Sequence, residues 1–111
     1  MTPRETLPTR RPNVTRAIEW AGHPITVTVG LRVDGSPAEV FADTARGGDM
    51  AATLADACVL ISIALQHGIA PADLAKSLGR VPLLRAPGGQ VEDARQDAPA
   101  SPIGAIVEVL L

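Results

Sequence analysis

Residues 25–33 alternate strictly between apolar side chains and other side chains. The apolar positions are Ile25, Val27, Val29, Leu31 and Val33, and the positions between them are Thr26, Thr28, Gly30 and Arg32. A period of two in β-branched residues is typical of a β-strand with one buried face, because successive side chains point to opposite sides. The pattern therefore predicts a strand over Ile25–Val33 whose odd-numbered side chains face a core.

A shorter strand is predicted on each side of this one. Residues 15–20 form the first, and Ala21-Gly22-His23-Pro24 then supplies a turn. Asp34-Gly35 follows the long strand as a tight-turn signal. Residues 38–44 return as the third strand, with Val40 on one face and Glu39, Phe41 and Asp43 on the other. Strands joined in this way are most simply arranged as an antiparallel meander.

The next segment has the spacing of a long helix. Residues 50–66 place apolar side chains three and four apart, and residues 59–65 are apolar nearly all round. We expect Asp49 to be its N-cap and Gly68 to end it. A helix with so little polar surface needs cover on two sides, for example from the sheet and from a partner subunit.

The rest of the chain predicts two shorter helices. The first begins at Pro71 and ends at Gly79, and a flexible loop follows over residues 86–99. Ser101 is expected to cap the last helix, with Pro102 in its first position. The predicted fold class is α+β: a three-stranded antiparallel β-meander packed on one long central helix, followed by a short helix and a C-terminal helix. We expect one domain over residues 15–111, preceded by a flexible arm over residues 1–14.

Composition narrows the function classes. The 111 residues carry a formal net charge of −2 and two aromatic side chains, Trp20 and Phe41, which disfavours binding of nucleic acid through a basic or aromatic surface. Cys58 is the one cysteine, so an intrachain disulfide and a cysteine metal cluster are excluded. The first 14 residues hold no apolar signal region, and no apolar run reaches the roughly 20 residues of a membrane span. We expect a cytoplasmic protein with no membrane contact.

Each chemically active side chain on the long helix has a structural interpretation. His67 lies in the last turn, where its ring can bind the free carbonyls of the helix. Cys58 lies among apolar residues, where a thiol stays protonated. Ser62 is expected to bond back to the carbonyl four residues earlier.

The remaining motifs are weak evidence for a catalytic, phosphate-binding or metal-binding site. Glu39 and Asp43 share a strand face, but no base or nucleophile accompanies them. Gly47-Gly48 precedes a helix without the rest of a phosphate-binding fingerprint. His23 and His67 lack metal-ligand spacing. We therefore predict no catalytic residue, no metal site and no cofactor.

Residues 65–78 allow one alternative, a helix-turn-helix. The Gly in the turn fits that motif, but the second helix carries Lys76 against Asp73 and no Arg, Asn or Gln that would read base edges. A nucleic-acid-binding or transcription factor therefore stays the second hypothesis, and a small ligand-binding protein or enzyme that uses Glu39 and His67 stays the third.

Four motifs in order resemble the TSCPD domain family. They are residues 34–41 (DGSPAEVF), Gly47-Gly48, residues 60–69 (LISIALQHGI) and residues 74–78 (LAKSL). This domain is found at the C-terminal end of adenosylcobalamin-dependent ribonucleotide reductases and as short stand-alone proteins. Where the family has its Thr-Ser-Cys-Pro-Asp motif, this chain has Ala100-Ser101-Pro102-Ile103-Gly104, so Ser101 is kept and the cysteine and aspartate are absent.

The resemblance implies an accessory or regulatory association domain linked to deoxyribonucleotide metabolism. One cysteine and 111 residues are too few for reductase chemistry, so the chain is not expected to be an enzyme on its own. The apolar helix segment over residues 59–65 and the apolar C-terminus predict a homodimer, because so small a domain has difficulty covering both. The resemblance implies a ribonucleotide reductase-type enzyme as a further partner. The candidate binding residues of the family motifs are Glu39, Phe41, Gly48, Ser62, Gln66, His67, Gly68 and Ser101.

Overall fold

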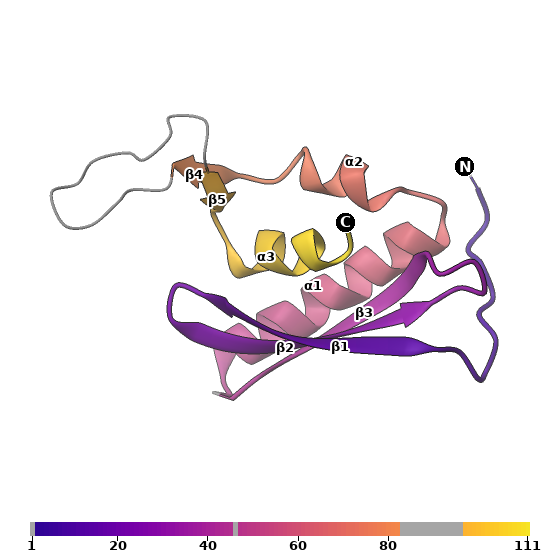
Figure 1. The fold of residues 1–111 in the computed structure, drawn as a ribbon, viewed down its shortest axis with the longest axis horizontal. Helices are drawn as coiled ribbons and strands as arrows, with labels where there is room; N and C mark the ends of the chain where they lie inside the picture. Colours follow the sequence, from indigo (N-terminus) through magenta and orange to yellow (C-terminus); the bar gives the residue numbers. More distant parts are fainter. Residues whose placement is uncertain (1, 46, 83–96) are drawn as a thin grey trace, which may run out of the picture.

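The computed structural model of the chain describes residues 2–45, 47–82 and 97–111. The elements in order are β1 (Asn13–Trp20), β2 (His23–Leu31), β3 (Pro37–Thr44), α1 (Asp49–Gln66), α2 (Pro71–Ala75), β4 (Arg80–Pro82), β5 (Asp97–Pro99) and α3 (Pro102–Val109). The first three strands form an antiparallel sheet in sequence order, and α1 runs alongside β3 (Figure 1). The predicted α+β class and the meander packed on a long helix are confirmed.

The β1–β2 hairpin turns more tightly than expected. Trp20 pairs with His23, so the loop consists of Ala21 and Gly22 alone, with φ of 49° and 80°. Two positive φ values in a two-residue loop match the right-handed twist of the flanking strands. His23 and Pro24 therefore belong to β2 rather than to the turn, and β1 begins at Asn13 rather than Thr15.

The other end of β2 stops two residues early. The strand ends at Leu31 after a register shift between Gly30 and Leu31. The backbone has already turned at Arg32, whose N–H donates to Ser36 O at 2.8 Å and whose carbonyl accepts from Gly35 at 2.9 Å. Val33 was predicted on the buried face, but it lies in this turn and is 96% exposed.

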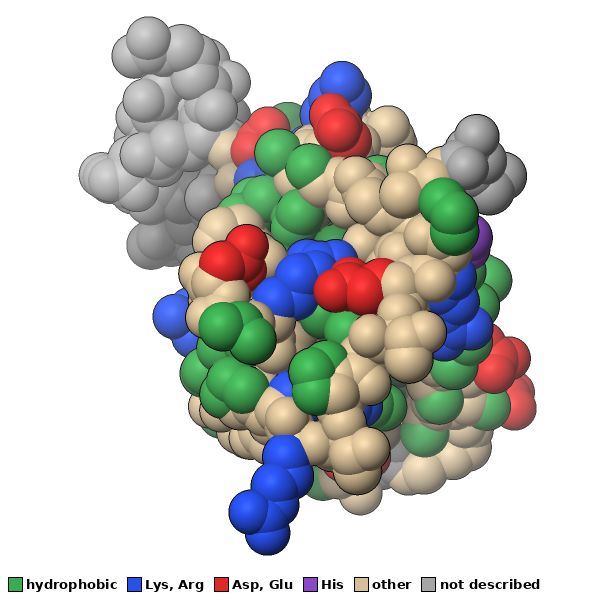
Figure 2. Space-filling model, turned by 90° about the vertical axis from the view of Figure 1, so that its right-hand side faces the viewer, with side chains coloured by type: hydrophobic (Ala, Val, Ile, Leu, Met, Phe, Trp, Pro, Cys, Tyr) green, Lys and Arg blue, Asp and Glu red, His purple; other side chains and the backbone are tan. Residues whose placement is uncertain are grey.

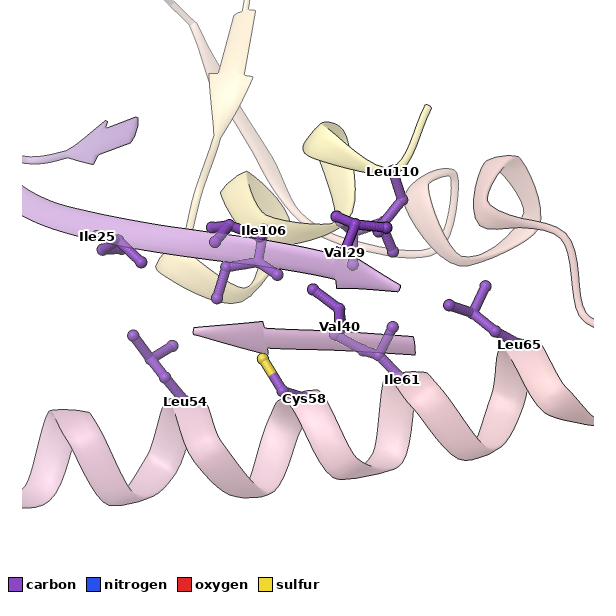
Figure 3. Close-up of a cluster of buried hydrophobic side chains, with 11 residues drawn as sticks. Ile25, Val29, Val40, Leu54, Cys58, Ile61, Leu65, Ile106 and Leu110 are labelled. Atoms are coloured by element: carbon purple, nitrogen blue, oxygen red, sulfur yellow. The ribbon is translucent and has the colours of Figure 1, made fainter. Parts of the chain in front are cut away.

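A hydrophobic core lies on one face of the sheet (Figure 3). The inward side chains of β2 and β3 meet side chains from α1 and from α3 there. The core residues are Ile25, Val27, Val29, Val40, Leu54, Cys58, Ile61, Leu65, Ile106, Val107 and Leu110. Both helices therefore cover the same face, and the opposite face carries Thr28, Gly30 and Phe41.

The two ends of α1 differ in how they are capped. Asp49 was expected to be the N-cap, but Gly48 holds that position with φ of 88° and Asp49 is the first helical residue. Its carboxylate there complements the positive end of the helix dipole. At the other end Gly68 has φ of 90°, its N–H donates to Leu65 O at 3.0 Å, and Ile69 N–H donates to Ala64 O at 3.1 Å. This pair of bonds is a Schellman motif, so Gly68 ends the helix as predicted.

Part of the loop predicted before the C-terminal helix is a β-strand. Residues 97–99 were predicted as loop, but they form β5 and pair with β4; residues 86–96 of the predicted loop lie outside the described residues. The indole N–H of Trp20 donates to Pro99 O at 3.1 Å and ties this pair to the sheet. Ser101 caps α3 by accepting from Gly104 N–H at 3.1 Å, with Pro102 in the first helical position, as predicted.

Cys58 gives the fold a predictable response to alkaline pH. Its side chain is 3% exposed, and burial, with a smaller contribution from the Asp43 carboxylate, raises the pKa of the thiol to about 11. The unfolded thiol ionises near pH 8.5. Stability from the protonated thiol is therefore complete below about pH 8.5 and is lost as pH rises toward 11. Urea unfolding between pH 8 and 11 should show a steeper loss of stability in the wild type than in Cys58→Ala; equal slopes would contradict this.

Candidate functional site

The eight residues predicted from the family motifs lie in separate places. Gly48 and Ser101 are the N-caps of α1 and α3. Ser62 and Gln66 face the edge of β3, and His67 and Gly68 end α1 beside the N-terminal arm. Glu39 and Phe41 lie on the helix-free face of the sheet. The structure therefore does not bring the eight residues into one site.

Ser62 and Gln66 bind the outer edge of β3. The Ser62 hydroxyl accepts from Val40 N–H at 2.9 Å and lies 3.3 Å from Val40 O, and Gln66 Nε2 donates to Ala38 O at 3.2 Å. The predicted bond from Ser62 to its own helix is therefore wrong. The backbone groups along the edge of a sheet need partners, and α1 supplies them in place of a fourth strand.

The C-terminal end of α1 is held by the N-terminal arm. Arg4 Nε donates to Gln66 Oε1 and Glu5 N–H donates to Gln66 O, each at 2.7 Å. The His67 ring lies with Nδ1 2.6 Å from Thr2 O, where only a protonated Nδ1 can donate. The ring therefore binds the arm and not the helix carbonyls, contrary to the prediction. The flexibility expected for the arm over residues 1–14 stays a prediction.

Arg32, rather than His67, binds a free carbonyl group at the C-terminal end of α1. Its Nη2 donates to Leu65 O at 2.8 Å, its Nη1 to Pro37 O at 2.7 Å, and its Nε to Glu5 Oε1 at 2.7 Å. It thus joins the end of α1, the β2–β3 turn and the arm. Figure 2 shows this end of the molecule, where basic and acidic side chains lie side by side. Sequence reasoning missed Arg32, because its position in the alternation marked it only as an outward residue of a strand.

Glu39 is buried on the helix-free face although it is charged. Only 8% of the residue is exposed, and an ideal Cβ at Gly30 would lie 2.9 Å from its Cδ. Gly30 therefore makes room for the carboxylate, which forms an ion pair with Arg11. The hydrogen bond to Glu39 raises the pKa of the Arg11 guanidinium. A shallow hollow of about 630 Å³ lies beside this pair and includes the half-exposed Phe41.

These contacts do not bring together the side chains that the enzyme hypothesis requires. Glu39 is paired with Arg11 and His67 with the backbone of Thr2, so the two side chains of the enzyme hypothesis have different partners. Within residues 2–45, 47–82 and 97–111, no group of three His, Cys, Asp or Glu side chains could hold a metal ion.

The outer side of α1 carries an apolar stripe that the fold leaves uncovered. We define the α1 stripe as the exposed Ala52, Ala55, Val59 and Leu60 with the partly buried Ile63; the exposed Asp56 lies on the same side of the helix, one turn before Leu60. Val59 is 56% exposed and Leu60 is 69% exposed. The sequence predicts that this helix packs against the sheet on one side and against a partner on another. The sheet covers the first side, and the other side faces solvent in the single chain.

By length and composition, α1 could also cross a membrane. It has 18 residues, of which 33% are buried. A single helix of this kind is weak evidence for a membrane protein, because core helices of soluble proteins meet the same criteria. Its inward side chains contribute Leu54, Cys58, Ile61 and Leu65 to the core.

Comparison with known families identifies the family of this chain. The family model of the TSCPD domain matches residues 1–110. The chain therefore belongs to the TSCPD domain family, a domain of ribonucleotide reductases. The match includes the N-terminal arm that contacts α1. The comparisons with curated proteins and with solved structures found no match.

Proposed function

We propose that this protein is a non-catalytic association domain that acts by binding a second copy of itself and a ribonucleotide reductase-type enzyme. The observation that carries the proposal is the α1 stripe, which holds two large apolar side chains largely in water. Burying one Val or Leu side chain fully is worth about 1.5–3 kcal/mol. A contact that covers Val59 and Leu60 in both copies gains part of this for each of four side chains, which offsets part of the entropic cost of association.

The order of side chains along the α1 stripe favours a second copy as the occupant. Its N-terminal half is small, with Ala52 and Ala55, and its C-terminal half is bulky, with Val59, Leu60 and Ile63. In an antiparallel pair of α1 helices related by a two-fold axis, the bulky half of each lies on the small half of the other. The apolar side chains of such a surface are complementary in size, which favours a symmetric dimer, whereas the two Asp56 carboxylates lie near the axis and their repulsion opposes it.

The link to ribonucleotide reductase rests on the family. The domain accompanies these enzymes, and this chain lacks the means for their chemistry: Cys58 is buried and protonated, and Pro102 stands where the family motif has its cysteine. We therefore place it beside the enzyme, in the cytoplasm, as an accessory or regulatory part of deoxyribonucleotide synthesis. Sedimentation of the purified protein with a purified adenosylcobalamin-dependent reductase tests this link; comigration supports it, and independent sedimentation contradicts it.

The geometry gives less support to the helix-turn-helix alternative. The second helix of that motif, α2, has five residues, which is short for a helix that reads a major groove. Lys76 after it forms an ion pair with Asp73 at 3.2 Å, so the nearby cation is already paired.

Dimer formation is tested by placing a charge in the α1 stripe. Leu60→Glu should give a monomer, because the new carboxylate would be buried without a partner in the dimer. Sedimentation equilibrium at micromolar concentration should report a dimer for the wild type and the chain mass of 11.5 kDa for the variant.

Val33→Glu is the matched control, since Val33 is 96% exposed in the β2–β3 turn and lies away from the stripe. It should remain dimeric. A monomeric wild type, or a Leu60→Glu variant that stays dimeric, would contradict the proposal.

A further inference from the structure

The two outer edges of the sheet differ in whether another element binds their backbone groups. The edge of β3 is bound by Ser62 and Gln66 of α1. At the other edge, residues 13–17 of β1 are all exposed. β1 contains neither Pro nor Lys and pairs with β2 without a bulge, so it lacks three features that commonly block an open edge.

The hydrogen-bond alternation shows which groups of β1 are free for pairing. Leu31 N–H donates to Pro12 O, and the residues that bond to β2 recur at every second position from there. The N–H groups of Thr15, Ala17 and Glu19 therefore point away from β2. Within the described part of the chain, no backbone bond outside the strand ladder engages these three groups.

Two apolar hollows lie beside this edge, on the core face. One, of about 570 Å³, includes Ile18, Trp20 and Ala105, and the carboxylate side chains of Glu19 and Glu108 also line it. The other, of about 420 Å³, includes Val14 and Leu111. Arg16 and Val109 line both hollows, so the two are neighbours along β1 and α3.

Arg16 lies between the two hollows on the same strand face as Val14 and Ile18, because side chains of one face recur at every second residue. Its side chain is exposed and forms no ion pair with the described residues. A free guanidinium between two apolar hollows is complementary to a carboxylate flanked by apolar side chains.

We propose that the open edge of β1 binds an extended segment of a partner protein that has an acidic residue with an apolar residue two positions before it and another two positions after it. The backbone of the segment pairs with Thr15, Ala17 and Glu19, the acidic side chain lies opposite Arg16, and the two apolar side chains enter the hollows. This is strand addition, in which backbone bonds give affinity and alternate side chains give selectivity.

This binding site is distinct from the α1 stripe and extends the proposed association function to an acidic, extended partner. β1 forms one edge of the sheet, and β3, which packs against α1, forms the other edge. Leu60→Glu should therefore bind the segment as well as the wild type does. Loss of the dimer in that variant with retained binding separates the two proposals.

The probe is a fluorescein-labelled peptide, Ser-Thr-Val-Thr-Glu-Thr-Val-Thr-Ser, compared with the same peptide carrying Lys in place of Glu. Fluorescence anisotropy should show about tenfold tighter binding of the Glu peptide by the wild type. Arg16→Glu should reverse the preference, because the charge opposite the central residue is reversed. Lys76→Glu is the matched control: Lys76 is an exposed cation that lines neither hollow, and the preference should not change.

Amide hydrogen exchange on the wild type gives a measurement that needs no variant. Binding of the Glu peptide should slow exchange at Thr15, Ala17 and Glu19 more than at Val14 and Ile18, which already bond to β2. No binding of the Glu peptide, a preference that Arg16→Glu leaves unchanged, or slowed exchange elsewhere without a change at β1 would overturn the proposal.

Discussion

Replacing Ile106 by alanine is expected to lower the free energy of unfolding by about 2–5 kcal/mol, the cost typical of a large-to-small change in a core. Ile106 is 0% exposed and comes from α3, which closes the core over the sheet beside α1. Truncation would remove three methyl or methylene groups and leave a cavity among the inward side chains of β2, because neither the strands nor α1 can move into it freely.

Urea unfolding measures this change, at several protein concentrations so that dissociation of a dimer is separated from unfolding. Leu111→Ala is the matched control, since Leu111 follows the same helix but is 67% exposed, and it should cost well under 1 kcal/mol. An Ile106→Ala variant as stable as Leu111→Ala would show that α3 does not close the core.

Replacing Ser62 by alanine is expected to cost about 1–3 kcal/mol, although the change removes one oxygen atom. The hydroxyl is the partner of both the N–H and the carbonyl of Val40, and both residues are buried. Without it, two backbone groups at the edge of β3 lose their partner where water does not reach easily. The cost comes from these unsatisfied groups rather than from lost packing.

Thr53→Ala is the control for Ser62→Ala, because it removes a hydroxyl from the exposed side of the same helix and should be nearly neutral. Hydrogen exchange at Val40 should be faster in Ser62→Ala and unchanged in Thr53→Ala. Equal stability of the two variants would mean that Ser62 does not hold β3.

The parts of the fold that local patterns determine were predictable. The alternation around Val27 and Val29 gave the central strand, Gly68 ended the long helix, and Ser101 with Pro102 began the last one. Each of these signals acts within a few residues of the chain. The exact ends of β2 were not predictable, because they depend on a two-residue loop at one end and on Arg32 bonding across the turn at the other.

The roles of the polar residues on α1 depend on contacts that are distant in sequence. Ser62 and Gln66 bind a strand 22 and 28 residues away, and His67 binds the arm 65 residues away. A single sequence shows a serine in an apolar helix but not which edge it faces. The apolar excess of residues 59–65 predicts a second covering surface; Val59 and Leu60 are exposed in the single chain, and the cover itself stays a prediction.

Intermolecular contacts between methyl groups test the central claim most directly. A sample mixed from carbon-13-labelled and unlabelled protein reports, by filtered nuclear Overhauser spectroscopy, only contacts between different copies. Antiparallel pairing through the α1 stripe predicts contacts from the methyls of Val59 and Leu60 in one copy to those of Ala52 and Ala55 in the other. Contacts that map to another surface, or none at a concentration where the wild type sediments as a dimer, would contradict the account.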